Sequence, residues 1–209
     1  MEEFIRCAQT VCYGSTNEER NTAEAQLSVI IEQEGALPAF LDALYSAEDT
    51  VFFFICLGLQ RILWKRWGQL EQQDQSRVTQ ALSEALTTRG TSAKTTALQV
   101  FARRKLEQVV SCVCAQLGSL DPVVAVLQAL SVPAAGEEEG HEAASEIRRL
   151  ISQLSLLRTV LEETLNLGDP RLTPQQQEAA QAAAVGMVVP ATALACSTIQ
   201  RFMGELGTT

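Results

Sequence analysis

DTVFFFICLGLQRILWKRWGQLEQQDQSRVTQALSEAL, residues 49–86, is the stretch that determines the fold class of this chain. Apolar residues recur at helical spacing in both of its halves, and a short polar turn joins the halves. The stripes consist of Phe52, Ile55, Cys56, Leu59, Ile62 and Leu63 in the first helix, and of Val78, Leu82, Ala85 and Leu86 in the second. Each helix therefore needs a neighbour, which is typical of one unit in a stack of helical hairpins.

The composition of the whole chain also favours helices. Its 209 residues are 46% hydrophobic but only 5% aromatic, which suits helix-on-helix packing around a sizeable core. Valine, isoleucine and threonine show no sustained alternation between Asn-Gly or Asp-Gly turns, as strands would. We therefore predict an all-α chain of stacked antiparallel hairpins, a HEAT-like α-solenoid. A plain helical bundle is the alternative.

Further helices are expected on both sides of this hairpin. A leading helix at 2–13 ends at Gly14, a capping box near Thr16 opens a hairpin at 17–46, and a polar turn at 87–92 precedes a third unit that Gly118 interrupts. We expect hairpins over 1–133, the acidic loop AAGEEEGHE at 134–142, and continuous further repeats over 143–209. The residues expected to point inward from these helices include Tyr45, Phe101 and Ile151.

Residues 179–200 carry no charge and are long enough to span a bilayer. Gln181, Pro190 and Ser197 interrupt the segment, and alanine contributes little transfer energy. We expect a buried, alanine-rich helix that is kinked or broken at Pro190, and no membrane insertion. The N-terminus, MEEFIRCAQTVC, is acidic where a secretory signal would be basic, so we expect no signal peptide.

The residue types of metal and catalytic sites are scattered. The six cysteines, at 7, 12, 56, 112, 114 and 196, show no CxxC spacing and are expected to be buried free thiols. His141 is alone in the acidic loop, and Glu137, Glu138 and Glu139 beside it are expected to be solvated, although they have the chemistry to hold a cation or a basic peptide. No GxxxxGK[ST] or GxGxxG motif is present. We expect no metal, no cofactor and no enzymatic activity.

Charge narrows the class of partner. A net charge of −9 argues against a nucleic-acid surface and favours a protein partner. Two short basic clusters, Lys65–Arg66 and Arg103–Lys105, either face acidic groups of a partner or pair with neighbouring glutamates. Trp64 and Trp67 are three residues apart and share a helix face, and we expect them to pack in the core rather than to line a peptide groove.

Four stretches carry a likeness to a known family. They are STNEERNTAEAQL at 15–27, LPAFLDAL at 37–44, TVFFFICLGLQRILWKRW at 50–67 and FARRKLEQVVSCVCAQLGSLDP at 101–122. In this order they resemble the N-terminal HEAT repeats of the importin-β (karyopherin) superfamily, its exportin type in particular. SQLSLLRTVLEETLNL at 152–167 looks like the exportin domain that follows. A weaker likeness points to the actin-exporting branch of the exportins.

The resemblance implies a nuclear transport receptor. Similar exportins bind the small GTPase Ran in its GTP form through the inner helices of their first repeats, here residues 37–46, 74–86 and 122–130, and they carry protein cargo past nucleoporins between nucleus and cytoplasm. Family members are several times longer, so we expect a fragment or a truncated product. Asp42, Arg77 and Glu84 are the candidate partner-binding residues, with a solvated face as the alternative for them. A HEAT-type interaction scaffold unrelated to Ran and a helical bundle around an apolar ligand are the rival functions.

Overall fold

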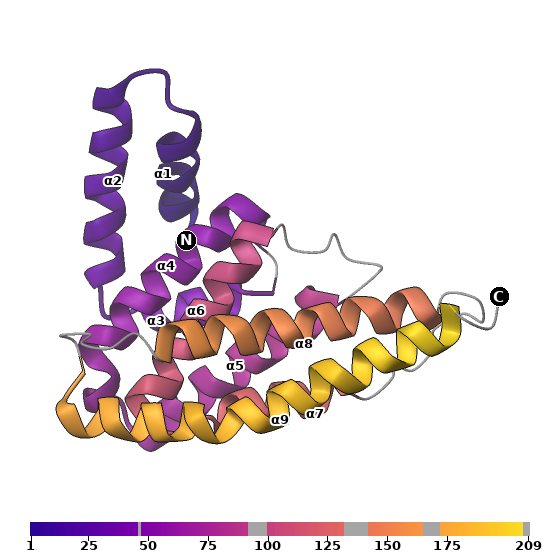
Figure 1. The fold of residues 1–209 in the computed structure, drawn as a ribbon. Coiled ribbons are helices and arrows are strands. Elements are labelled where there is room, and N and C mark those ends of the chain that lie inside the picture. Colours follow the sequence, from indigo (N-terminus) through magenta and orange to yellow (C-terminus); the bar gives the residue numbers. More distant parts are fainter. Residues whose placement is uncertain (46, 92–99, 132–141, 165–171, 207–209) are drawn as a thin grey trace. The chain divides into compact units, whose positions relative to one another are not determined.

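The computed structural model describes residues 1–45, 47–91, 100–131, 142–164 and 172–206, which contain helices and turns but no strand (Figure 1). They fall into two compact units, residues 1–112 and 113–209, divided within α6. The elements are α1 (Glu2–Tyr13), α2 (Asn17–Glu32), α3 (Ala36–Ala43), α4 (Asp49–Arg66), the 3-10 turn η1 (Trp67–Gln69), α5 (Gln72–Thr91), α6 (Val100–Leu117), α7 (Asp121–Ser131), α8 (Glu142–Thr164) and α9 (Pro174–Leu206). The all-α prediction is confirmed for these residues. The HEAT-like stacking and the domain limits at 133 and 143 stay predictions.

The start of the first unit follows the predicted local chemistry. The Thr16 hydroxyl accepts a hydrogen bond from the Glu19 backbone N–H (3.2 Å), and the Glu19 carboxylate accepts from the Thr16 N–H (3.2 Å) and the Ser15 N–H (2.9 Å). This capping box satisfies donors that the first turn of α2 leaves unpaired. The predicted cap is confirmed, and α1 and α2 lie side by side along their length (Figure 1).

A close crossing fixes α4 against its neighbours. A Cβ atom at Gly58 would lie 2.6 Å from Cε2 of Phe40 on α3 and 3.2 Å from Cγ1 of Ile31 on α2, so only glycine allows this approach. Phe40 in turn packs against Phe4 of α1, with ring centroids 4.6 Å apart. The predicted stripe of α4 is confirmed, because the following residues are all buried: Phe52, Ile55, Cys56, Leu59, Ile62 and Leu63.

The next helix, α5, buries its predicted face but ends later than expected. Val78, Leu82, Ala85 and Leu86 are buried. The polar turn predicted at 87–92 is wrong for residues 87–91, which continue α5. The hydroxyls of Thr87 and Thr88 return hydrogen bonds to carbonyls one turn earlier, and Arg89 is anchored in the core. Polar side chains that are satisfied in this way do not interrupt a helix.

Two predicted core residues of the first unit lie outward. Tyr45 is 47% exposed, because its hydroxyl reaches Glu84 on the surface. Phe101 is 46% exposed at the start of α6, although its ring contacts that of Phe53 at a centroid distance of 5.8 Å. Helical spacing identified the right side of each helix but not the width of the buried stripe, which depends on the neighbouring helix.

In the second unit, Gly118 ends α6 as predicted. Its φ of +63° lies in the left-handed region, and the Ser119 N–H donates to the Cys114 carbonyl at 3.2 Å, which closes a Schellman turn. Asp121 then begins α7. The acidic loop up to His141 lies outside the described residues, and Glu142 is the first residue of α8. Along α8, Leu156, Leu157 and Val160 are buried, whereas Ile151, predicted to be inside, is 57% exposed.

The alanine-rich segment forms part of one continuous helix, α9, which packs along α8 within this unit (Figure 1). The prediction of a buried helix is wrong, since Val185 and Val189 are 63% and 75% exposed. Ala180 and Ala184 are the buried residues among those of α9 whose burial the structure describes. The helix continues through Pro190 without a break. Among the described helices, none combines the length and the apolar character that a bilayer crossing requires.

Candidate protein-interaction surface

The three predicted partner-binding residues lie on two helices that pack against each other, α3 and α5. Arg77 on α5 donates from Nη2 to Oδ1 of Asp42 on α3 at 3.1 Å, and the two side chains are 54% and 74% exposed. Glu84 is seven residues beyond Arg77, two turns along the same side of α5. The structure therefore brings Asp42 and Arg77 into direct contact and places Glu84 on the same helix as Arg77.

Tyr45 belongs to this surface and was not predicted to do so. Its hydroxyl donates to Oε2 of Glu84 at 2.8 Å, and Gln80 donates from Nε2 to Oε1 of the same carboxylate at 2.8 Å. Tyr45 is three residues after Asp42, in the turn that follows α3, and this closeness along the chain was the signal available in the sequence. We call Asp42, Tyr45, Arg77, Gln80 and Glu84 the α3–α5 strip.

The pKa values of Tyr45 and Glu84 on the α3–α5 strip are shifted in opposite directions. Burial raises the pKa of Tyr45 to about 12, and the hydrogen bond to Glu84 adds to the rise. Hydrogen bonds from Gln80 and then Tyr45 hold the pKa of Glu84 below its usual range. At neutral pH the strip thus presents a neutral phenol, an exposed guanidinium and two carboxylates, groups that suit polar recognition of another protein.

A guanidinium beneath the surface holds the end of α3 in place. Arg89 donates to the carbonyls of Leu44 (3.0 Å) and Ala47 (2.7 Å), lies 3.8 Å from the carboxylate of Asp49, and stands 4.6 Å from the centroid of the Phe52 ring. Its side chain is only 13% exposed, and burial lowers its pKa. Sequence reasoning placed Arg89 in a turn and missed this role, because none of its partners is near it along the chain.

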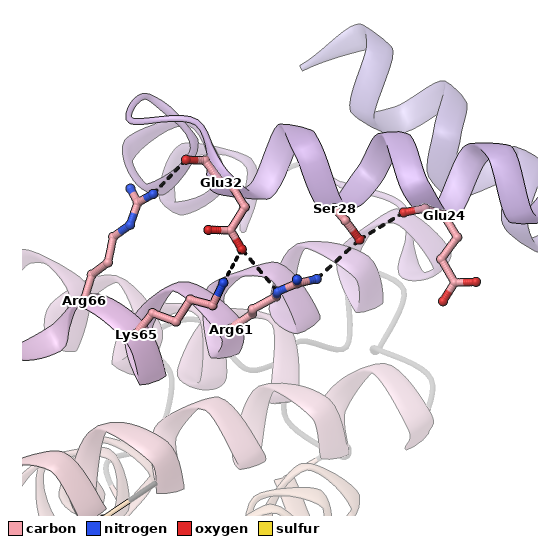
Figure 2. Close-up of polar contacts among 6 residues, drawn as sticks. All are labelled: Glu24, Ser28, Glu32, Arg61, Lys65 and Arg66. Carbon is pink, nitrogen blue, oxygen red and sulfur yellow. Dashed lines mark hydrogen bonds and ion pairs between the residues drawn. The ribbon is translucent and has the colours of Figure 1, made fainter.

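The first basic cluster pairs with a neighbouring glutamate, one of the two predicted outcomes. Figure 2 shows the Glu32 carboxylate of α2 between Lys65 and Arg61 of α4, with Arg61 Nε 3.4 Å from Oε1. Arg61 also donates to the Ser28 hydroxyl at 3.3 Å, and Arg66 donates to the Glu32 backbone carbonyl at 2.7 Å. The hydrogen bond from Lys65, followed by the nearby positive charges, lowers the pKa of Glu32.

The second basic cluster is also engaged within the chain. Arg103 donates to the buried carboxylate of Glu107 at 3.1 Å, and Lys105 donates to the side-chain carbonyls of Gln60 (2.6 Å) and Gln108 (3.2 Å). The preference for core packing at the tryptophans is confirmed for Trp67, which is 5% exposed, while Trp64 is partly exposed.

The cysteines differ from one another in burial. All six are free thiols, and Cys7, Cys56, Cys112 and Cys114 are buried as expected. The prediction is wrong for Cys12 and Cys196, which are exposed. Burial raises the pKa of Cys56, and it raises the pKa of Cys114 to about 12, so these buried thiols stay protonated.

Within the described residues, no group of histidine, cysteine and carboxylate side chains is arranged to hold a metal ion. The predictions for Glu137, Glu138, Glu139 and His141 concern residues outside the described ranges. The α3–α5 strip is therefore the surface that carries the predicted partner-binding residues.

Comparisons of this chain with protein-family models, with curated proteins and with solved structures found no match.

Proposed function

We propose that this chain acts by binding proteins, as the N-terminal part of an exportin-type nuclear transport receptor whose α3–α5 strip contacts Ran in its GTP form. The support is the likeness of residues 15–122 to exportin repeats together with the placement of Asp42, Arg77 and Glu84 on helices that pack against each other. In this role the chain performs no chemistry, and the nucleotide and its hydrolysis belong to Ran. Protein cargo and nucleoporins would be further partners of the same receptor.

The α3–α5 strip carries the proposal because it combines exposure with positioned polar groups. An exposed ion pair such as Arg77–Asp42 contributes only about 0–1 kcal/mol, so a partner's charges can replace it at little cost. Tyrosine and arginine are enriched among the residues that dominate binding energy at interfaces, and Tyr45 and Arg77 are both available on this strip. Glu84 orients the Tyr45 ring, which lowers the entropy lost when a partner packs on it.

Under this proposal, Ran-GTP acts as a selector of conformation. It binds the helical surface in one arrangement of the full receptor more tightly than in another and so shifts the population towards a cargo-holding state. Hydrolysis of GTP on Ran removes the differential contacts and reverses the shift. The direction of transport then depends on where the two nucleotide forms of Ran are abundant.

Binding to immobilised Ran, loaded with either a non-hydrolysable GTP analogue or GDP, tests the proposal. We expect the wild-type chain to bind the GTP form, and Tyr45→Ala to weaken that binding roughly 30-fold, as loss of about 2 kcal/mol implies. The charge-swapped pair Asp42→Arg with Arg77→Asp keeps the mutual attraction but presents reversed charges. It should retain the fold and lose binding.

Arg158→Glu, in the second unit, is the control, because Arg158 is also an exposed cation in an ion pair, here with Glu162 one turn along α8. It should bind Ran-GTP like the wild type. Equal binding to both nucleotide forms would refute the Ran assignment and favour an interaction scaffold. Undiminished binding by the charge-swapped pair would refute the assignment of the strip.

A further inference from the structure

We propose that the edge between α2 and α4 is a docking surface for an acidic segment of a partner protein. The residues that carry it are Arg61, Lys65 and Arg66, here called the α4 cation cluster, with Glu32 as the internal group that occupies it (Figure 2). This surface does not involve the α3–α5 strip and requires no contact with Ran.

The α4 cation cluster holds more positive charge than its own contacts neutralise. Among the described residues, the Glu32 carboxylate is the one that pairs with this cluster, and it contacts Arg61 and Lys65. Arg66 donates to the backbone carbonyl of Glu32, which removes no charge. Three cations therefore share a single negative charge, in a chain whose net charge is −9. Such a local reversal of sign attracts acidic groups and orients their approach.

A partner can displace the Glu32 carboxylate from the α4 cation cluster. The side chains of Arg61, Lys65 and Glu32 are 46%, 50% and 40% exposed, so their mutual attraction is screened by water and salt. The Glu32 carboxylate binds both Arg61 and Lys65 through the same oxygen, Oε1. A partner's carboxylates can therefore take over either cation, and a bidentate contact with Arg61 would exceed the single contact that Glu32 makes.

The spacing of the cations defines the chemistry of the segment. Arg61 and Lys65 are four residues apart on α4, which places them about 6 Å apart along the helix axis. Carboxylates on successive turns of a helix, or on alternate residues of an extended segment, repeat at a similar distance. Leu57, 39% exposed and one turn before Arg61, continues the same face with an apolar contact. We infer a short glutamate- or aspartate-rich segment.

A purely structural role for the α4 cation cluster gives different expectations, which makes the two readings separable. If the cluster only joins α2 to α4, removing the Glu32 charge weakens the fold and leaves binding unchanged. If Glu32 occupies a docking surface, removing its charge releases two cations for the ligand. Glu32→Gln should then bind an acidic peptide more tightly than the wild type does.

Titration of the full chain with fluorescein-labelled decaglutamate, followed by anisotropy at low and moderate salt, tests this expectation. We expect Glu32→Gln to tighten binding about twofold, since one exposed ion pair is worth about 0.5 kcal/mol. Arg61→Glu with Lys65→Glu should weaken binding at least tenfold. Binding should weaken as salt is added, and a labelled glycine-serine decapeptide should not bind.

Matched controls in the second unit separate the α4 cation cluster from net charge. Arg158→Glu and Glu162→Gln make the same two kinds of charge change at another exposed pair of the chain. Neither variant should change the affinity for decaglutamate by more than its change in net charge would cause. Circular dichroism should show that every variant is folded. An equal effect of the control variants, unchanged or weaker binding by Glu32→Gln, or no binding at about 1 mM peptide would each overturn the proposal.

Discussion

Replacing Gly58 by alanine tests whether the crossing of α4 with α2 and α3 is as close as the structure shows. The new Cβ atom would meet Cε2 of Phe40 at 2.6 Å and Cγ1 of Ile31 at 3.2 Å. Alanine in a helix interior is favoured over glycine by about 1 kcal/mol, whereas overpacking of a core costs about 1–3 kcal/mol. Phe40 is fully buried and itself packs on Phe4, so it has little room to move. We expect a net destabilisation of about 1.5 kcal/mol.

Tryptophan fluorescence during urea unfolding measures this change in the first unit alone, because both tryptophans, Trp64 and Trp67, lie there. With a urea dependence of about 1–3 kcal/mol per molar, the midpoint should fall by roughly 0.5–1.5 M. Phe40→Leu in the Gly58→Ala background shortens the opposing side chain and should recover part of the loss, whereas Phe40→Leu alone should destabilise.

Gly186→Ala is the control for this experiment, because it makes the same substitution within α9 and no atom lies within 4 Å of the added Cβ. Because Gly186 lies in the second unit, this variant is followed by circular dichroism, and it should stabilise that unit by up to about 1 kcal/mol through helix propensity. Destabilisation of similar size at both glycines would show that the Cβ contacts at Gly58 do not decide the outcome. A Gly58→Ala midpoint at or above the wild-type value would refute the close crossing.

Three further predictions concern single residues. First, Tyr45 should ionise with a pKa of about 12, so its contribution to stability is full below pH 10 and is lost as pH rises through 12. An ultraviolet titration of tyrosinate should show an ionisation near pH 12 that is missing in Tyr45→Phe. Second, Arg89→Lys should lower the stability of the first unit by about 2 kcal/mol in unfolding detected by fluorescence. The reason is that lysine cannot reach both the Leu44 and Ala47 carbonyls and also stack on Phe52. A loss under about 0.5 kcal/mol would contradict this role. Third, Gly118→Ala should destabilise the second unit by about 1–2 kcal/mol, as measured by unfolding followed by circular dichroism. The reasons are that φ at this residue is +63° and that the new Cβ atom would lie 3.0 Å from the Cβ atom of Ala179. No loss of stability would argue against the left-handed turn.

The parts of the fold that depend on local chemistry could be predicted from the sequence. The capping box at Thr16 and the turn at Gly118 each rest on residues within a few positions of one another. The buried stripe of α4 was also identified correctly, because helical spacing alone selects those residues. In each case the physical cause lies within one or two turns of chain.

The errors share a different cause, which is long-range contact. Tyr45 was placed in the core because its helix has an apolar side there, but its hydroxyl bonds to Glu84, 39 residues away. Arg89 was placed in a turn, but its partners Leu44 and Ala47 lie more than 40 residues earlier. Val185 and Val189 are apolar and yet exposed, because the packing of α9 along α8 leaves them uncovered. No local pattern contains this information.

The same long-range contacts link the core to the proposed function. Asp42, Arg77 and Glu84 were predicted as three separate exposed positions, and they form one strip only because α3 lies against α5. Arg89 of α5 supports that packing, because it donates to the Leu44 and Ala47 carbonyls just after α3 and lies over Phe52 of α4. We infer that Arg89, which lies outside the α3–α5 strip, helps to hold Asp42 near Arg77. Arg89→Lys should accordingly weaken Ran-GTP binding as well as stability, while leaving the decaglutamate affinity of the α4 cation cluster close to that of the wild type. Loss of both activities together would show instead that the first unit unfolds as a whole.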